Sequence, residues 1–264
     1  MIRKLSKLIR NPQKYIVLSF KILLQSMCYF FQGAPFFLQG QMDINPKSRW
    51  HNPDFVKLSG GFFPKGDQER RQICDLEPWD NTRRDMLALF LRTIDVSNIE
   101  GDFAEVGVYK GLTAKLIHYY APARKLHLFD TFEGFTDRSV ITEQQNTNLS
   151  ISATHFSDTS LDAVKGYVAA KNANVFFWKG YFPESIPNGL TTFAFVHLDA
   201  DLYDPILKGL EYFYPRMSRS GIIVVHDYNA WPGARKAVDE FFADKNELPI
   251  PMPDKSGSAF IIKY

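Results

Sequence analysis

Residues 101–111 combine residue types that suit chemistry on a charged, nucleotide-like ligand. A short apolar run contains Glu105 near its end, a turn with Gly107 follows, and a helix is predicted from Leu112 to Tyr120. A glycine turn after a strand lets a ligand approach the backbone, and the first N–H groups of the next helix point toward that ligand. The pattern therefore favours a nucleotide-like ligand site, with an ordinary strand-turn-helix unit as the alternative.

The glycine spacing and the acid narrow the class of ligand. Gly107 and Gly111 are separated by three residues, so no G-x-G-x-x-G dinucleotide fingerprint can be drawn through them. The carboxylate of Glu105 also disfavours a pyrophosphate and suits a cation or a hydroxyl donor. S-adenosylmethionine offers both, with its ammonium, its sulfonium and its ribose hydroxyls.

A second acid occupies the position that binds ribose in nucleotide-binding α/β folds. Asp130 follows a predicted strand, about 20 residues after the glycine turn, where a carboxylate commonly accepts hydrogen bonds from a ribose diol. We expect Asp130 to bind the ribose, with a helix cap or a loop acid as the alternative.

Acids and a histidine also follow two later predicted strands. Asp199 and Asp201 come after one apolar run, and His226 and Asp227 come after the next. Carboxylate oxygens suit Mg²⁺, whereas an imidazole ligand favours Mn²⁺ or a later transition metal. A divalent cation held between the ends of these two strands is one interpretation, and ordinary solvated acids are the alternative.

The elements that must position these residues are apolar strands alternating with helices. This pattern predicts a mostly parallel sheet covered by helices on both faces, with the strands' carboxyl ends and their acids at one edge. Predicted strands cover 103–106, 125–129, 175–178, 193–198 and 221–225; predicted helices cover 79–96, 112–120, 160–171, 205–214 and 233–243; a terminal hairpin joins 248–250 to 259–262.

Residues 131–159 form a long polar connection in this pattern. Connections of such length in compact domains are usually functional or disordered. We interpret the segment as a mobile lid over an acceptor, with a merely disordered loop as the alternative.

Composition excludes several classes of protein. The chain has 264 residues, of which 45% are hydrophobic and 23% charged, as in globular proteins. Two cysteines are too few for a disulfide scaffold, which suits a reducing compartment. Beyond residue 42 acids outnumber bases, so we expect no nucleic-acid partner.

The first 42 residues differ from the rest, because they contain basic residues and no acid. The apolar stretch 15–31 is interrupted by Lys21 and Gln25, which makes it a poor membrane span. Three interpretations stay open: a helix in residues 1–31 on the inner membrane surface of a cytoplasmic protein, an extension packed on the body or on a second subunit of a homo-oligomer, and a true membrane span. We predict three regions: a basic extension (1–42), an irregular and helical cap (43–100) and a catalytic domain (101–264).

Several motifs in order resemble the macrocin-type O-methyltransferases, class I S-adenosylmethionine enzymes that methylate sugar hydroxyls of natural products. The resemblance covers roughly residues 75–264. It is carried by Asp-Phe-Ala-Glu-Val-Gly-Val-Tyr-Lys-Gly at 102–111, Leu-Phe-Asp-Thr-Phe-Glu-Gly-Phe at 128–135, Lys-Gly-Tyr-Phe-Pro-Glu-Ser-Ile-Pro at 179–187, His-Leu-Asp-Ala-Asp-Leu-Tyr at 197–203 and His-Asp-Tyr at 226–228.

The resemblance implies a seven-stranded class I methyltransferase fold, a sugar-containing acceptor and a set of site residues. Asp199 maps to the family's general base. The resemblance also implies a divalent metal, Mg²⁺ or Mn²⁺, held by Asp199, His226 and Asp227, and His226 stands where the family commonly has an acid. The implied cofactor-binding residues are Glu105, Gly107, Tyr109, Gly111, Asp130 and Thr131, with Gly180 and Tyr181 near the adenine. An oxidoreductase acting with NAD or on a nucleotide sugar, and a non-catalytic cofactor-binding protein, are the alternatives.

Overall fold

The computed structural model describes residues 80–169 and 174–264 of the chain. The basic segment 1–42 lies outside the described residues, so its expected contact with a membrane and the boundaries of the first two regions stay predictions. No helix within the described residues is both long and apolar enough to span a bilayer.

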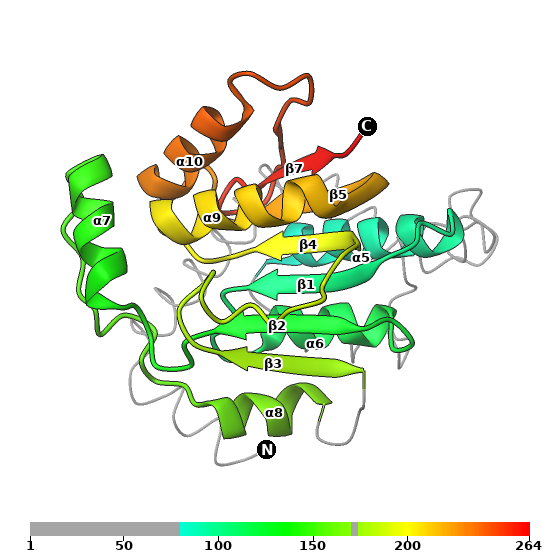
Figure 1. Ribbon diagram of the computed structural model, residues 1–264, viewed down its shortest axis with the longest axis horizontal. Coiled ribbons are helices and arrows are strands. Elements are labelled where there is room, and N and C mark those ends of the chain that lie inside the picture. The colour runs from blue at the N-terminus through cyan, green and yellow to red at the C-terminus, as the bar shows by residue number, and fades with distance from the viewer. Residues whose placement is uncertain (1–79, 170–173) are drawn as a thin grey trace, which may run out of the picture. The chain divides into compact units, whose positions relative to one another are not determined.

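A seven-stranded sheet forms the centre of the fold, in the order β3-β2-β1-β4-β5-β7-β6 (Figure 1). The strands are β1 (Asp102–Val106), β2 (Leu126–Asp130), β3 (Val175–Lys179), β4 (Phe193–Leu198), β5 (Met217–Val225), β6 (Ile250–Pro251) and β7 (Ala259–Ile262). The first five strands pair in parallel, whereas β7 is antiparallel to both β5 and β6. The predicted α/β fold with an antiparallel C-terminal hairpin is confirmed.

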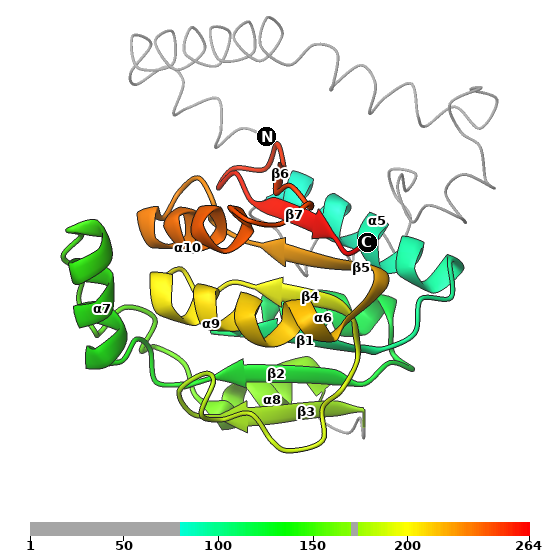
Figure 2. The same cartoon turned by 45° about the horizontal axis from the view of Figure 1, so that its top comes forward.

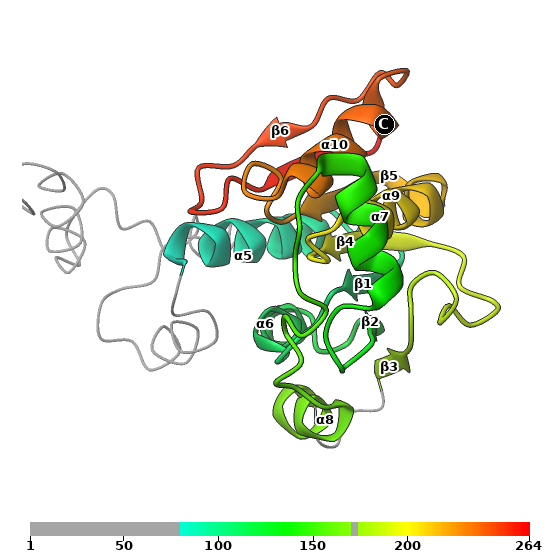
Figure 3. The ribbon, with the colours of Figure 1, turned by 90° about the vertical axis from the view of Figure 1, so that its left-hand side faces the viewer.

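Helices cover both faces of this sheet. Figure 3 shows α5 and α6 on one face and α9 and α10 on the other. The helices are α5 (Asn81–Val96), α6 (Leu112–Tyr120), α7 (Asp137–Thr147), α8 (Leu161–Ala169), α9 (Tyr203–Phe213) and α10 (Pro232–Phe242), with a short 3₁₀ turn at Tyr214–Arg216. Every residue of β4 is buried, because it is the middle strand of the sheet and has helices on both sides.

Helix α7 corrects the interpretation of residues 131–159 as an irregular connection. Thr136 caps the helix by accepting a hydrogen bond from the backbone N–H of Ser139 at 3.1 Å. The buried residues of α7 are Ser139 and Glu143, both polar. Since the apolar periodicity that usually reveals a helix is absent, the sequence pattern missed it.

Glu143 docks α7 against the ends of two other helices. Its Oε2 accepts a hydrogen bond from the backbone N–H of Tyr203, the first residue of α9, at 2.7 Å. A Cβ added to Gly233, near the start of α10, would lie 2.1 Å from the same oxygen. A buried carboxylate at two helix N-termini is favoured by both helix dipoles. Figures 1 and 2 show the result: α7 stands beside α9 and α10, beyond the strands' carboxyl ends.

Strand β5 begins at Met217 rather than at the predicted Gly221. The pairing with β4 shifts register between Phe193 and Phe195, so the polar residues 218–220 form an irregular stretch within the strand. This interruption of the apolar pattern explains why the earlier start was missed. The hairpin's first strand is likewise displaced from the predicted 248–250 to Ile250–Pro251.

A buried histidine gives the fold a predicted pH dependence. His127 lies in β2, stacks on Phe176 and accepts a hydrogen bond from the Trp178 indole N–H at 3.3 Å, while its Nε2 contacts Asp102 at 3.0 Å. Burial lowers the pKa of His127, although Asp102 opposes the shift. A pKa that is lower in the folded than in the unfolded chain means that protons favour unfolding. Its stabilising contribution is therefore present above about pH 6.5 and is lost as the pH falls below that value.

We expect His127→Gln to lose less thermal stability than the wild type between pH 7.5 and pH 5.5, because its side chain does not titrate. Melting curves at the two pH values measure the difference. His155→Gln, which changes an exposed histidine, is the matched control and should keep the wild-type pH dependence. An unaltered pH dependence in His127→Gln would show that other groups cause it.

Candidate functional site

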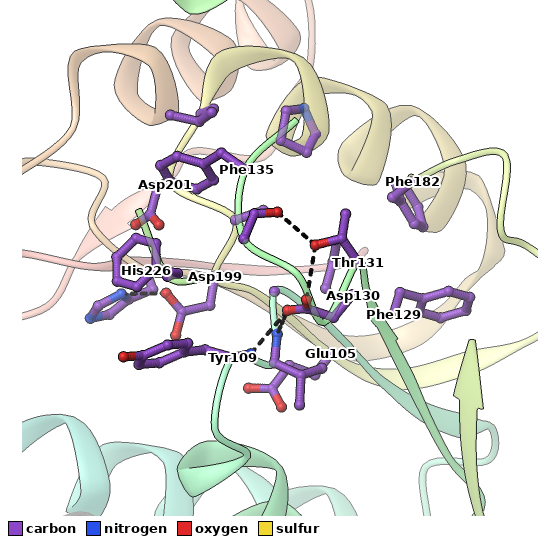
Figure 4. Close-up of a pocket in the computed structure, with 18 of the residues that line it drawn as sticks. Glu105, Tyr109, Phe129, Asp130, Thr131, Phe135, Phe182, Asp199, Asp201 and His226 are labelled. Carbon is purple, nitrogen blue, oxygen red and sulfur yellow. Dashed lines mark hydrogen bonds and ion pairs between the residues drawn. The ribbon is translucent and has the colours of Figure 1, made fainter. Parts of the chain in front are cut away.

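A cavity of about 340 Å³ lies where the strand order reverses, between β1 and β4 (Figure 4). Ligands of open α/β sheets bind at such a reversal. The cavity is lined by these residues predicted to bind cofactor or metal: Glu105, Gly107, Tyr109, Asp130, Thr131, Gly180, Tyr181, Asp199, His226 and Asp227. Residues following five different strands therefore meet in one place, as the sequence predicted.

The two glycines of the turn have different roles. Gly107 has a φ of +84°, and a Cβ added there would lie 2.1 Å from the carbonyl oxygen of Asp199. A glycine at 107 thus lets the chain pass close to the end of β4. Gly111 is not among the residues that line the cavity, and a Cβ there would lie 2.6 Å from the side chain of Val168 in α8. The structure places Gly111 in contact with α8, although its neighbours Lys110 and Leu112 line the cavity.

Asp130 holds the glycine turn in place. Its Oδ2 accepts hydrogen bonds from the backbone N–H groups of Val108 and Tyr109 at 2.6 and 2.9 Å, and its Oδ1 accepts one from Phe132 at 2.5 Å. Two carboxylate oxygens offer about four acceptor positions, so capacity remains for a ligand hydroxyl. The hydroxyl of Thr131 is occupied, because it donates to the carbonyl of Gly134 at 2.6 Å.

The loop after β3 is joined to the same region. The backbone N–H of Gly180 donates to the carbonyl of Asp130 at 3.0 Å. Tyr181 donates its hydroxyl to Asp204, which fixes the ring against α9. Burial and the contact with Asp204 raise the pKa of Tyr181 to about 12, so the phenol stays neutral.

Glu105 and His197 form a buried pair beneath the cavity. His197 Nδ1 lies 2.9 Å from Glu105 Oε1, whereas Glu105 Oε2 and His197 Nε2 have no hydrogen-bond partner among the described residues. Burial, assisted by Asp199, raises the pKa of Glu105 well above its usual range. Burial lowers the pKa of His197 to about 3. Both shifts favour the neutral forms, which avoids an uncompensated buried charge.

Asp199, His226 and Asp227 meet at the ends of β4 and β5. His226 Nδ1 lies 2.6 Å from Asp199 Oδ1 and 3.3 Å from Asp227 Oδ2. Burial opposes ionisation of Asp199, but His226 and Arg83 hold the pKa of that carboxyl well below its usual range. Burial also opposes protonation of His226, and the carboxylate of Asp199 outweighs it and raises the pKa of His226.

The ligand atoms of these three residues lie within 4.8 Å of one another, so the donor set fits a divalent cation. One imidazole nitrogen and two carboxylates form a mixed donor set that suits Mn²⁺ or a later transition metal. Asp201 is not part of this group. Burial and the neighbouring carboxylate of Asp199 raise the pKa of Asp201, which favours its neutral form.

The sequence pattern did not single out three side chains that line the cavity, which come from α5 and from the polar connection. Arg83 reaches it from α5, with NH1 2.5 Å from His226 Nε2 and 3.7 Å from Asp199 Oδ2. Nothing in the local sequence distinguishes Arg83 from the arginine beside it. The polar connection supplies Phe135 and Phe156, whose rings lie 5.3 Å apart and line the cavity. Residues 131–159 thus border the site as the lid interpretation expects.

Solved structures place this architecture among the methyltransferases. The chain is similar to the O-methyltransferase NovP, with a TM-score of 0.59 and 19% identity over 86% of this chain and 98% of that one. It is also similar to the calicheamicin methyltransferase CalS11, with a TM-score of 0.56 and 20% identity over 73% of this chain and 80% of that one. These likenesses show the Rossmann-like fold of the class I methyltransferases.

The chain belongs to the macrocin-O-methyltransferase (TylF) family, whose profile matches residues 80–260. It is 27% identical to the demethyldecarbamoylnovobiocin O-methyltransferase of Streptomyces niveus, over 56% of this chain and 60% of that one. It is 28% identical to the mycinamicin III 3''-O-methyltransferase of Micromonospora griseorubida, over 54% of this chain and 61% of that one. The matched stretch thus spans less than two thirds of these curated relatives. The resemblance found in the sequence is confirmed, and the family argues against the oxidoreductase alternative.

Proposed function

We propose that the protein transfers a methyl group from S-adenosylmethionine to a hydroxyl of a sugar or a glycosylated small molecule. The observation that carries the proposal is a single cavity that contains both the glycine turn with Asp130 and the ionised Asp199. A cofactor site and a base therefore adjoin in a chain of this family. One relative is the 4'-O-methyltransferase of a rhamnosyl tetracenomycin C, and another is the mycinamicin III 3''-O-methyltransferase, which supports this class of acceptor.

The cofactor occupies the half of the cavity near β1 and β2. Asp130 accepts hydrogen bonds from the ribose hydroxyls, while the Gly107 and Tyr109 turn faces the cofactor. Gly180 and Tyr181 border the adenine. The unpartnered Oε2 of Glu105 lies where a ligand ammonium would meet it, and such a cation would favour ionisation of this carboxyl.

Asp199 accepts the proton of the acceptor hydroxyl. Bound S-adenosylmethionine would supply the methyl group: its carbon–sulfur bond would break as the new oxygen–carbon bond forms, and S-adenosylhomocysteine would leave with the sulfur electron pair. An alcohol becomes strongly acidic only as the new bond forms, so a carboxylate of low pKa suffices as the base. The cavity supplies the alignment of oxygen, carbon and sulfur that such a displacement needs.

A divalent metal at Asp199, His226 and Asp227 would lower the pKa of the acceptor hydroxyl. The donor set fits Mn²⁺ or a later transition metal better than Mg²⁺, because one ligand is an imidazole. The homo-oligomer and the cytoplasmic location expected from the sequence remain predictions.

Binding of S-adenosylhomocysteine tests the cofactor assignment. We expect Asp130→Ala to weaken it about 10- to 100-fold in titration calorimetry, because a charged acceptor is lost from the ribose and from the turn. Asp158→Ala is the matched control. Asp158 accepts from the Tyr109 hydroxyl at 2.6 Å and pairs with Lys110, but it does not line the cavity. The control should bind within a few-fold of wild type. Equal binding by Asp130→Ala and wild type would contradict the assignment of Asp130 to the ribose. Binding of NAD in place of S-adenosylhomocysteine would contradict the methyltransferase proposal.

A further inference from the structure

Arg83 lies against the cluster that would hold the metal. Its NH1 atom is 2.5 Å from His226 Nε2 and 3.7 Å from Asp199 Oδ2, and its side chain is only 13% exposed. The guanidinium comes from α5, on the face of the sheet opposite α9 and α10. It therefore brings a permanent positive charge to a group of carboxylates from a separate part of the chain.

The two ring nitrogens of His226 face partners of opposite character. Nδ1 faces the carboxylates of Asp199 and Asp227 and is the nitrogen that a metal would use. Metal-bound histidines normally carry a proton on the other nitrogen and donate it to a carboxylate, a carbonyl or water. Here the other nitrogen, Nε2, faces a guanidinium, which has donors and no acceptor. Arg83 therefore disfavours the imidazole tautomer that metal binding needs.

The positive charge of Arg83 also opposes metal binding. A divalent cation at the cluster would be attracted by the carboxylates of Asp199 and Asp227. The guanidinium already lies close to one of these carboxylates and would repel a second cation placed beside it. Both effects lower metal affinity without removing any of the three ligands.

We propose that Arg83 competes with a divalent metal for the Asp199, His226 and Asp227 cluster and so keeps its metal affinity low. The inference rests on the metal site of the proposed function. It makes Arg83 a residue that sets metal affinity through its contacts with two ligands. A metal in this enzyme is then weakly held and readily exchanged.

Titration calorimetry of the full chain with MnCl₂, without cofactor, tests the inference. Arg83→Gln removes the charge and offers a carbonyl oxygen to His226 Nε2–H, so it should bind Mn²⁺ at least about tenfold more tightly than wild type. Arg83→Met removes the charge without adding an acceptor and should show a smaller gain. Arg83→Lys keeps the charge and should bind as weakly as wild type.

Two outcomes would overturn the inference. The first is that Arg83→Gln and Arg83→Met bind Mn²⁺ no more tightly than wild type. The second is that the wild-type protein itself binds Mn²⁺ with micromolar affinity. Addition of Asp227→Asn to Arg83→Gln should abolish the gain, which ties the signal to this cluster. Melting curves check folding, and a separate titration with S-adenosylhomocysteine tests the cofactor site, so failure of one proposal is distinguishable from failure of the other.

Discussion

Asp199→Asn is expected to lower kcat by about 10²- to 10⁴-fold, the range typical for loss of a general base. The side chain lines the cavity and is held ionised by His226 and Arg83. An asparagine of the same shape cannot accept the hydroxyl proton and is a poorer metal ligand. It removes no contact assigned to the cofactor, so S-adenosylhomocysteine should bind within a few-fold of wild type. Single-turnover methyl transfer and titration calorimetry measure the two quantities.

Asp201→Asn is the matched control for this experiment. Asp201 lines the same cavity two residues along the same loop, but burial and Asp199 raise its pKa and so favour its neutral form. We expect an amide at this position to cause little loss of turnover. If Asp199→Asn keeps a near-wild-type rate, the proton leaves by another route and the cluster is structural. If neither variant nor wild type transfers methyl groups, the non-catalytic alternative gains support.

The elements that the sequence predicted best are those whose first and last residues are determined by neighbouring residues in the chain. Helix Leu112–Tyr120 and strand Phe193–Leu198 have the predicted ends, because a glycine or an acid closes each apolar run. The convergence of acids could also be predicted, since the carboxyl ends of parallel strands share one edge. That rule uses only strand direction and needs no knowledge of packing.

The features that escaped prediction depend on contacts between distant parts of the chain. Helix α7 packs through Glu143 onto the starts of α9 and α10, so its buried face carries a charge instead of an apolar stripe. Arg83 meets His226 across 143 positions, and no spacing rule connects them. Gly111 has the spacing of a ligand-binding glycine, but its missing side chain makes room for Val168. Local patterns find elements and edges, whereas such pairings follow from tertiary packing.

Gly107→Ala is expected to have the largest effect on stability. A methyl group there would lie 2.1 Å from the carbonyl oxygen of Asp199, a backbone atom that no side-chain rotation can move. The φ of +84° adds the strain of a left-handed conformation, about 1–2 kcal/mol for a residue with a Cβ. Relief requires β1 and β4 to separate where the glycine turn begins. The same displacement would move Asp199 away from the acceptor, so turnover should fall together with stability.

Gly189→Ala separates the two causes of this loss. Gly189 has a similar φ of +92°, but an added Cβ would meet no atom within 4 Å. It should therefore lose only the conformational part, about 1–2 kcal/mol of unfolding free energy, and keep its activity. Urea unfolding at constant m value measures both variants. Gly107→Ala should be less stable than Gly189→Ala by a further 2 kcal/mol or more, on the order of the cost of forcing atoms into a packed site. Equal losses of stability would mean that the backbone at Asp199 can move aside at little cost. The close approach of the ends of β1 and β4 would then not determine the position of Asp199.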